Sequence, residues 1–131
     1  MPVSGGPLAR FRRIKEKTAR ELDKWALEGA EQIAEEARRL VDEGGIPPPN
    51  HVVSAPGSPP NTEYGNLVAN TGAEKLPDIG KAIAYSDAEY SSYQEFGTSN
   101  MYERPFMRPA TANKRQHVLT LARNAVSRGS K

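Results

Sequence analysis

A single stripe of apolar residues runs through the first forty positions and constrains the fold more than any other feature. Its members are Leu8, Phe11, Ile14, Leu22, Trp25, Gly29, Ile33, Ala37 and Leu40, separated mostly by three or four residues. That spacing is the period of an amphipathic helix, and Gly44 and Gly45 followed by Pro47 favour its end. We predict one helix over residues 8–43. At about 1.5 Å per residue it is roughly 50 Å long, so part of it should extend beyond a small domain and contact a partner.

A segment rich in Pro, Gly, Ser and Asn follows over residues 44–63. Prolines fix φ and favour extended polyproline II backbone, and a loop of this length is unusual inside a small domain. We expect an extended arm that orders on a neighbouring subunit, with a linker as the alternative. The residues predicted for this arm are Ile46, Pro47, Val52, Val53, Pro56, Pro59 and Pro60.

The middle of the chain is weakly patterned. Residues 66–70 and 82–86 can each form a short strand, with Ile83 and Tyr85 alternating in the second, whereas residues 71–81 are rich in turn formers. We predict a small antiparallel sheet packed against the long helix.

Aromatic residues mark the next segment. Tyr90, Tyr93 and Phe96 are spaced by three, which predicts one or two packed helical turns that Gly97 ends. Pro109 suits the first position of a closing helix over residues 109–128. Its inward-facing residues are predicted to be Val118, Leu121, Ala122 and Ala125. The sequence thus predicts an α+β fold in one domain, residues 1–131, in which residues 64–108 hold the small sheet and the aromatic segment.

The residues that usually carry out chemistry are sparse. The chain has no cysteine, which excludes disulfides, thiolate metal sites and cysteine nucleophiles. His51 and His117 have no acidic residue at the spacing of a triad or a metal site, and no phosphate-binding or dinucleotide-binding motif occurs. Glu35 with Glu36, and Asp87 with Glu89, are typical of solvated surfaces. We therefore expect no catalytic, cofactor-binding or metal-binding residues and no enzymatic activity.

Charge is unevenly distributed although the net charge is only +2. Basic residues gather at both ends of the chain, namely Arg10, Arg12, Arg13, Lys15 and Lys17, and then Arg115, Arg123, Arg128 and Lys131. Solvated helix faces and contact with a negative partner surface or nucleic acid are both compatible with this pattern. The opening residues lack the apolar run of a signal peptide, and no stretch is long enough for a membrane span, so no membrane partner is expected.

Residues 90–110, hereafter the signature segment, contain two short motifs. The first consists of Tyr90, Tyr93, Glu95, Gly97 and Thr98. The second is the unbroken block Arg104, Pro105, Phe106, Met107, Arg108, Pro109 and Ala110. The two prolines favour a stiff extended turn with Phe106 anchored inward. We expect one guanidinium, from Arg104 or Arg108, to pair with Glu95 and the other to remain for an acidic neighbour.

These motifs resemble those of the gene-product-ten-like head–tail joining family of HK-type long-tailed bacteriophages, also described as neck or tail-completion proteins. GAEQIAEEAR in the first helix and APGSPPNTEYGNLVAN after the Pro-rich loop resemble two further elements of that family. The family often has a hydrophobic strand after the second element, where this chain is polar and rich in turn formers.

The resemblance implies a structural virion protein at the phage head–tail junction. Copies would form an oligomeric ring, a connector between the portal and adaptor or head-completion proteins and the tail terminator or tail tube proteins. The ring would leave a channel for viral double-stranded DNA, with only non-specific proximity to it. The protein would be made in the host cytoplasm and carried in the virion. The signature residues would then serve the fold or an interface: Tyr90, Tyr93, Glu95, Phe96, Gly97, Thr98, Arg104, Pro105, Phe106, Arg108 and Pro109.

Two other functions stay open. One is the tail terminator, a protein that caps the tail tube and resembles a neck protein in its size and in forming a ring. The other is a small nucleic-acid-binding accessory protein for DNA packaging, which the basic ends and the tyrosines would suit.

Overall fold

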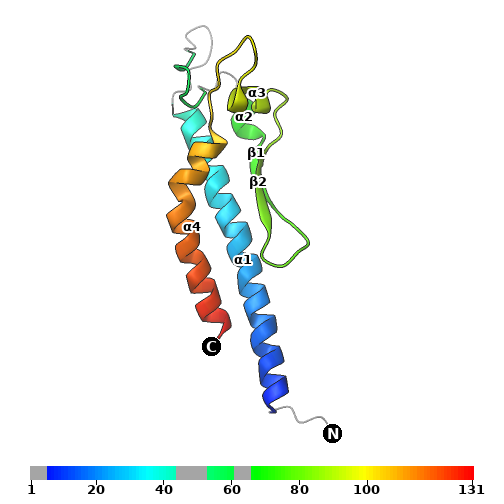
Figure 1. The fold of residues 1–131 in the computed structure, drawn as a ribbon. Coiled ribbons are helices and arrows are strands. Elements are labelled where there is room, and N and C mark those ends of the chain that lie inside the picture. The colour runs from blue at the N-terminus through cyan, green and yellow to red at the C-terminus, as the bar shows by residue number, and fades with distance from the viewer. Residues whose placement is uncertain (1–5, 44–52, 61–65) are drawn as a thin grey trace.

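The computed structural model describes residues 6–43, 53–60 and 66–131. Two long helices lie side by side and antiparallel, α1 (Pro7–Asp42) and α4 (Met107–Gly129), and a hairpin of β1 (Thr71–Lys75) and β2 (Ala82–Ser86) packs on the other side of α1 (Figure 1). Two short helices, α2 (Asn66–Ala69) and α3 (Ser91–Phe96), lie near the end where α1 stops and α4 starts. The α+β prediction is confirmed.

The face of α1 that packs on α4 and the hairpin is built from small residues. Ala26, Gly29, Ala30, Ala34 and Ala37 are buried along it. A Cβ atom on Gly29 would lie 3.1 Å from Val118 Cγ1, so a larger residue would require the Val118 side chain to shift. Trp25 lies at the edge of this face and donates its indole N–H to the Val118 carbonyl over 2.8 Å. Small side chains thus allow close packing of α1 on α4, and the Trp25 hydrogen bond joins the two helices.

The first turns of α1 extend past the end of α4. Gly129, the last residue of α4, contacts Thr18, where a Cβ on the glycine would lie only 2.5 Å from the Thr18 Cα. Residues 7–17, hereafter the overhang, continue beyond this contact (Figure 1). Leu8 and Phe11 on the overhang are 70% and 66% exposed, although the sequence places them in the apolar stripe. The expected extension of the helix beyond the domain is confirmed.

The hairpin differs from the prediction. Thr71 pairs with Ser86 and Lys75 with Ala82, so β1 lies in the stretch predicted to be turns, and residues 66–69 form helix α2 rather than a strand. β1 makes polar contacts with α1 at both of its ends. Arg38 Nη1 donates to the Thr71 carbonyl over 2.7 Å, and Lys75 Nζ lies 3.2 Å from Asp23 Oδ1. A strand held by charge and hydrogen bonds needs no apolar alternation, which is why the pattern missed it.

The core is small and lies where α1 ends and α4 begins. It consists of Ala37, Val41, Leu67, Ala88, Phe106 and Ala110, with Ile33, Leu40, Val68 and Met107 partly buried around it. Phe106 and Val41 are the largest fully buried side chains of the described residues. The predicted inward role of Phe106 is confirmed. Because the core depends on so few large residues, each of them carries much of the stability.

Both long helices were predicted close to their observed bounds. The predicted ranges 8–43 and 109–128 compare with Pro7–Asp42 and Met107–Gly129. The closing helix starts two residues before Pro109, so the prediction of its start was wrong. Pro109 is its third residue, a position where the missing N–H removes no helical hydrogen bond. Ala125 is buried, and Val118, Leu121 and Ala122 are half-buried, as the pattern predicts.

Candidate functional site

The signature segment is organised around the buried carboxylate of Glu95. The Glu95 side chain comes from α3, and the residue is 6% exposed. Its Oε2 accepts the backbone N–H groups of Phe106 (2.8 Å) and Met107 (3.0 Å), and its Oε1 accepts that of Arg108 (2.9 Å). These donors form the first turn of α4, where backbone N–H groups have no helical partner. Glu95 therefore caps a helix eleven residues further along the chain.

This cap explains the early start of α4. The residue at the N-cap position is Phe106, whose side chain cannot accept a hydrogen bond, and no side chain of α4 caps its own N-terminus. The negative charge of Glu95 faces the positive end of the helix dipole. The glutamate thus supplies what the local sequence lacks, and Met107 and Arg108 become helical.

The contacts of Glu95 also fix its ionisation. Burial by itself raises the pKa of this carboxyl, but the three backbone N–H donors and Arg108 outweigh it, and the pKa lies below its ordinary value. Both oxygens are occupied by donors. A carboxylate with a lowered pKa and no free lone pair directed at solvent is poorly suited to act as a general base. The arrangement stabilises structure and does not offer a proton acceptor.

Arg108, and not Arg104, provides the guanidinium that pairs with Glu95. Its Nε lies 3.1 Å from Glu95 Oε1, its Nη2 donates to the Glu95 carbonyl, and the same Nη2 lies 3.1 Å from Glu103 Oε2. The guanidinium also lies over the Phe96 ring, 5.3 Å from its centroid. The hydrogen bonds that Arg108 donates to Glu103 and Glu95 raise the pKa of its guanidinium above the usual value. Arg108 therefore ties α4 to α3 and to the loop between them.

Arg104 contacts the Pro-rich segment of its own chain, where its Nε donates to the Ser54 carbonyl over 3.0 Å. Its contact with an acidic neighbour stays a prediction. Close by, the Gly57 N–H donates to the Glu103 carbonyl over 2.8 Å. Residues 53–60, the described part of the predicted arm, are thereby held on the signature segment of the same chain.

The arm residues themselves are unequally placed. Pro60 is buried and Pro59 half-buried, whereas Val53 and Pro56 are exposed. Ile46, Pro47 and Val52 lie outside the described residues. A contact of this segment with another subunit stays a prediction.

Gly97 ends α3 as expected, with φ 73° and ψ 178°. The chain then turns, and the Thr98 N–H donates to the Met101 carbonyl over 2.8 Å. A Cβ on Gly97 would lie 2.9 Å from both Glu103 N and Met101 O. Positive φ and lack of space therefore both require glycine here. Pro105, half-buried, lies just before the anchor Phe106.

The aromatic edge of α3 faces outward, which contradicts the prediction that these rings are packed. Tyr93 is 55% and Phe96 68% exposed, and Tyr90, at the N-cap of α3, is also exposed. The buried residue of this short helix is instead Glu95. The Glu95 carboxylate occupies the buried position of this helix, where it accepts hydrogen bonds from the first turn of α4.

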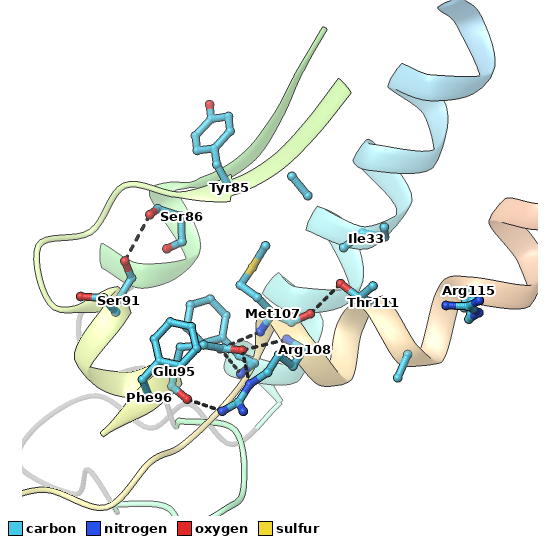
Figure 2. Close-up of a pocket in the computed structure, with 14 residues that line it drawn as sticks. Ile33, Tyr85, Ser86, Ser91, Glu95, Phe96, Met107, Arg108, Thr111 and Arg115 are labelled. Atoms are coloured by element: carbon cyan, nitrogen blue, oxygen red, sulfur yellow. Dashed lines mark hydrogen bonds and ion pairs between the residues drawn. The ribbon is translucent and has the colours of Figure 1, made fainter. Parts of the chain in front are cut away.

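A groove of about 740 Å³ lies beside this edge, between β2, α3 and α4, with α1 behind it (Figure 2). Its apolar lining includes Ile33, Ala84, Phe96, Phe106, Met107 and Ala112. Arg108 and Arg115 contribute the cations, and Tyr85, Ser86, Ser91, Ser92, Glu95 and Thr111 complete it. The Ser91 hydroxyl lies 2.8 Å from the Ala88 carbonyl and 3.1 Å from that of Ser86. An open apolar groove with exposed aromatic rings at its side is suited to bind another protein chain.

Other kinds of site find little support in the described part of the chain. No group of three or more His, Asp or Glu side chains there is placed to hold a metal ion. None of the helices in residues 6–43 and 66–131 has the length and apolar character needed to cross a bilayer. Glu36, predicted to be solvated, is buried and pairs with Arg39, which lowers the Glu36 pKa despite burial.

Comparison of the chain with protein-family models, with curated proteins and with solved structures gave no match.

Of the predicted site residues, the structure brings Glu95, Phe106 and Arg108 into one contact network and leaves Tyr93 and Phe96 exposed beside it. The Arg104 side chain instead binds the 53–60 segment, while its backbone N–H donates to the Gln94 carbonyl of α3. Sequence reasoning missed the groove itself, because Ile33, Tyr85 and Arg115 come from three elements with no shared motif. It also missed Ser54, whose contribution is a backbone carbonyl and leaves no signal in the sequence.

Proposed function

We propose that this protein is a structural subunit of a tailed-phage virion, placed at the head–tail junction as one copy of a ring that connects the portal and adaptor complex to the tail. The observation that carries the proposal is the state of the signature segment. Its Glu95 and Arg108 side chains hold α3 to α4, while Phe96 lines an apolar groove and Tyr93, on the same short helix, is exposed.

A second apolar surface supports a ring. Leu8 and Phe11 are exposed on the overhang, at the opposite end of the molecule from the groove (Figure 1). A head-to-tail ring needs two different surfaces on each subunit, one for each neighbour. The small core adds to this, since a chain that buries few large side chains by itself gains from burying more in an assembly. We assign the groove and the aromatic edge to the contact with a neighbouring copy.

The test is assembly in the phage that encodes the chain. The double variant Tyr93→Ser/Phe96→Ser removes two exposed rings and should therefore melt close to the unaltered protein. We expect it to leave filled heads and finished tails unjoined. Ile79→Ser is the matched control, because Ile79 is an equally exposed apolar side chain on the loop of the hairpin, away from the groove.

A reconstruction of the neck should show several identical copies around the DNA axis. A single copy per particle, or a double variant that joins heads and tails normally, would contradict the proposal. If the copies instead form the ring that caps the tail tube, the chain is the tail terminator.

A further inference from the structure

The strongest concentration of charge lies on the overhang and the turn after it. Residues 7–20 contain six basic side chains and one acidic side chain, Glu16. The rest of α1 reverses this balance, since residues 21–42 hold seven acidic and three basic side chains. The molecule therefore has one strongly positive end, where α1 extends beyond α4 (Figure 1).

A hollow of about 440 Å³ lies at this end, between α1 and the last residues of the chain. Five cationic side chains line it, Arg10, Arg13, Lys17, Arg20 and Lys131, together with the single carboxylate of Glu16. Lys17 Nζ lies 3.4 Å from the Lys131 carbonyl, which places the end of α4 beside the row of cations on α1. The basic residues from the two ends of the sequence thus meet in one place.

Three of the cations that line the hollow form no salt bridge within the described residues. Salt bridges are formed elsewhere by Lys24, Arg39, Lys75, Lys81, Arg108 and Arg128. Arg10, Lys17 and Arg20 are exposed and not among them. Like charges held this close repel one another, so a ligand with several negative charges would relieve a cost that the folded chain carries alone.

The overhang is two-sided. At about 100° per residue, Arg10, Arg13, Lys17 and Arg20 fall on one side of α1. Leu8 and Phe11 lie on the opposite side, together with Arg12 and Lys15. A helix that lies on a membrane inserts its apolar side while its cations reach the headgroups around it. Here the row of cations would point away from such a surface. Lys15, which falls between Leu8 and Phe11, also disfavours insertion of that side into a membrane. The row of cations therefore lies apart from the side that would contact a neighbouring copy.

The length of the row matches an extended polyanion. From Arg10 to Arg20 the helix rises about 15 Å, and B-DNA carries one charge about every 1.7 Å of its axis. A straight row of flexible cations can follow phosphates along such a distance without reading the bases.

We infer that the cationic row Arg10, Arg13, Lys17 and Arg20, with Lys131, is a binding surface for the phosphate backbone of double-stranded DNA, without sequence preference. In a head–tail ring this surface would face the DNA channel; that setting rests on the proposed function, whereas the binding itself does not.

The test is a titration of a fluorescent duplex of about 20 base pairs with the purified full chain, from about 50 to 200 mM NaCl, followed by anisotropy. About four phosphate contacts correspond to a slope of about −3.6 in log affinity against log salt. In Arg10→Gln/Lys17→Gln, two contacts are lost, so the slope should become shallower by about 1.8 and affinity at low salt should fall at least about tenfold. The control Lys81→Gln/Lys114→Gln removes the same charge elsewhere and should change affinity less than about twofold.

Three results would overturn the inference. First, the unaltered protein could fail to bind the duplex at the lowest salt. Second, both double variants could lose affinity equally, which would mean that binding depends on the net charge of the protein and not on this surface. The protein could also sediment with vesicles of phosphatidylcholine and about one third phosphatidylserine while ignoring the duplex, which would reassign the surface to membranes. No particle is needed here, so this inference and the head–tail proposal can fail separately.

Discussion

Replacing Glu95 with Gln tests the central contact of the fold with almost no change in shape. The carboxylate accepts four hydrogen bonds, three from the backbone of the first turn of α4 and one from Arg108 at 3.1 Å. An amide has only one acceptor oxygen, so the –NH₂ group of Gln must face donors that the carboxylate satisfied.

The magnitude follows from these contacts. A hydrogen bond to a charged group contributes about 1.5–3 kcal/mol and a neutral one about 0.5–1.5 kcal/mol. The favourable interaction with the helix dipole, about 0.3–1 kcal/mol, is lost as well. Burying a neutral amide costs less than burying a carboxylate, which offsets part of the loss. We expect Glu95→Gln to lower the free energy of unfolding by about 2–4 kcal/mol.

Thermal unfolding followed by circular dichroism measures this effect. For a chain of this size the loss corresponds to a fall in Tm of roughly 8–15 °C. Glu89→Gln is the matched control, because Glu89 is exposed near α3 and should melt within about 2 °C of the unaltered protein. A Glu95→Gln protein that melts with the control would refute the capping argument.

The same pair of proteins should differ in its response to acid. Because the folded-state pKa of Glu95 lies below its unfolded value of about 4.3, its stabilisation is complete above that pH and is lost as pH falls through the folded pKa. The difference in Tm between the unaltered protein and Glu95→Gln should therefore shrink as pH falls below about 4. A difference that stays constant down to the lowest measurable pH would mean that ionised Glu95 contributes nothing.

Three further substitutions test single contacts. Gly97→Ala should destabilise the fold by at least about 2 kcal/mol, since alanine is strained at φ 73° and its Cβ meets backbone atoms; a Tm equal to that of the unaltered protein would exclude this. Trp25→Phe should cost at least about 1 kcal/mol in urea unfolding, because one hydrogen bond to Val118 is lost and the smaller ring fills less of the space of the indole; no change in midpoint would show that bond to be neutral. Arg104→Ala should leave Tm almost unchanged but speed hydrogen exchange at the Gly57 amide, whereas Arg123→Ala should not; equal exchange would mean that the Ser54 contact does not hold the segment.

Several elements followed from the sequence alone because their cause is local. The long helix was predictable from an apolar stripe of helical period, and its N-terminal turns were expected to extend beyond the domain because no other part of so short a chain could cover them. Gly97 as the end of a short helix and Phe106 as a buried anchor were predictable for the same reason. Backbone sterics and hydrophobicity act within a few residues.

The remaining features depend on partners far apart in the chain, and only the tertiary structure decided them. β1 is held on α1 because Arg38 donates to the Thr71 carbonyl and Asp23 pairs with Lys75. A polar strand of this kind has no alternation of apolar and polar residues from which it could be predicted. Burial of Glu95 and exposure of Tyr93 and Phe96 reverse what hydrophobicity alone predicts. One carboxylate can be buried when four donors from the start of α4 surround it, and those donors meet it only once the chain has folded.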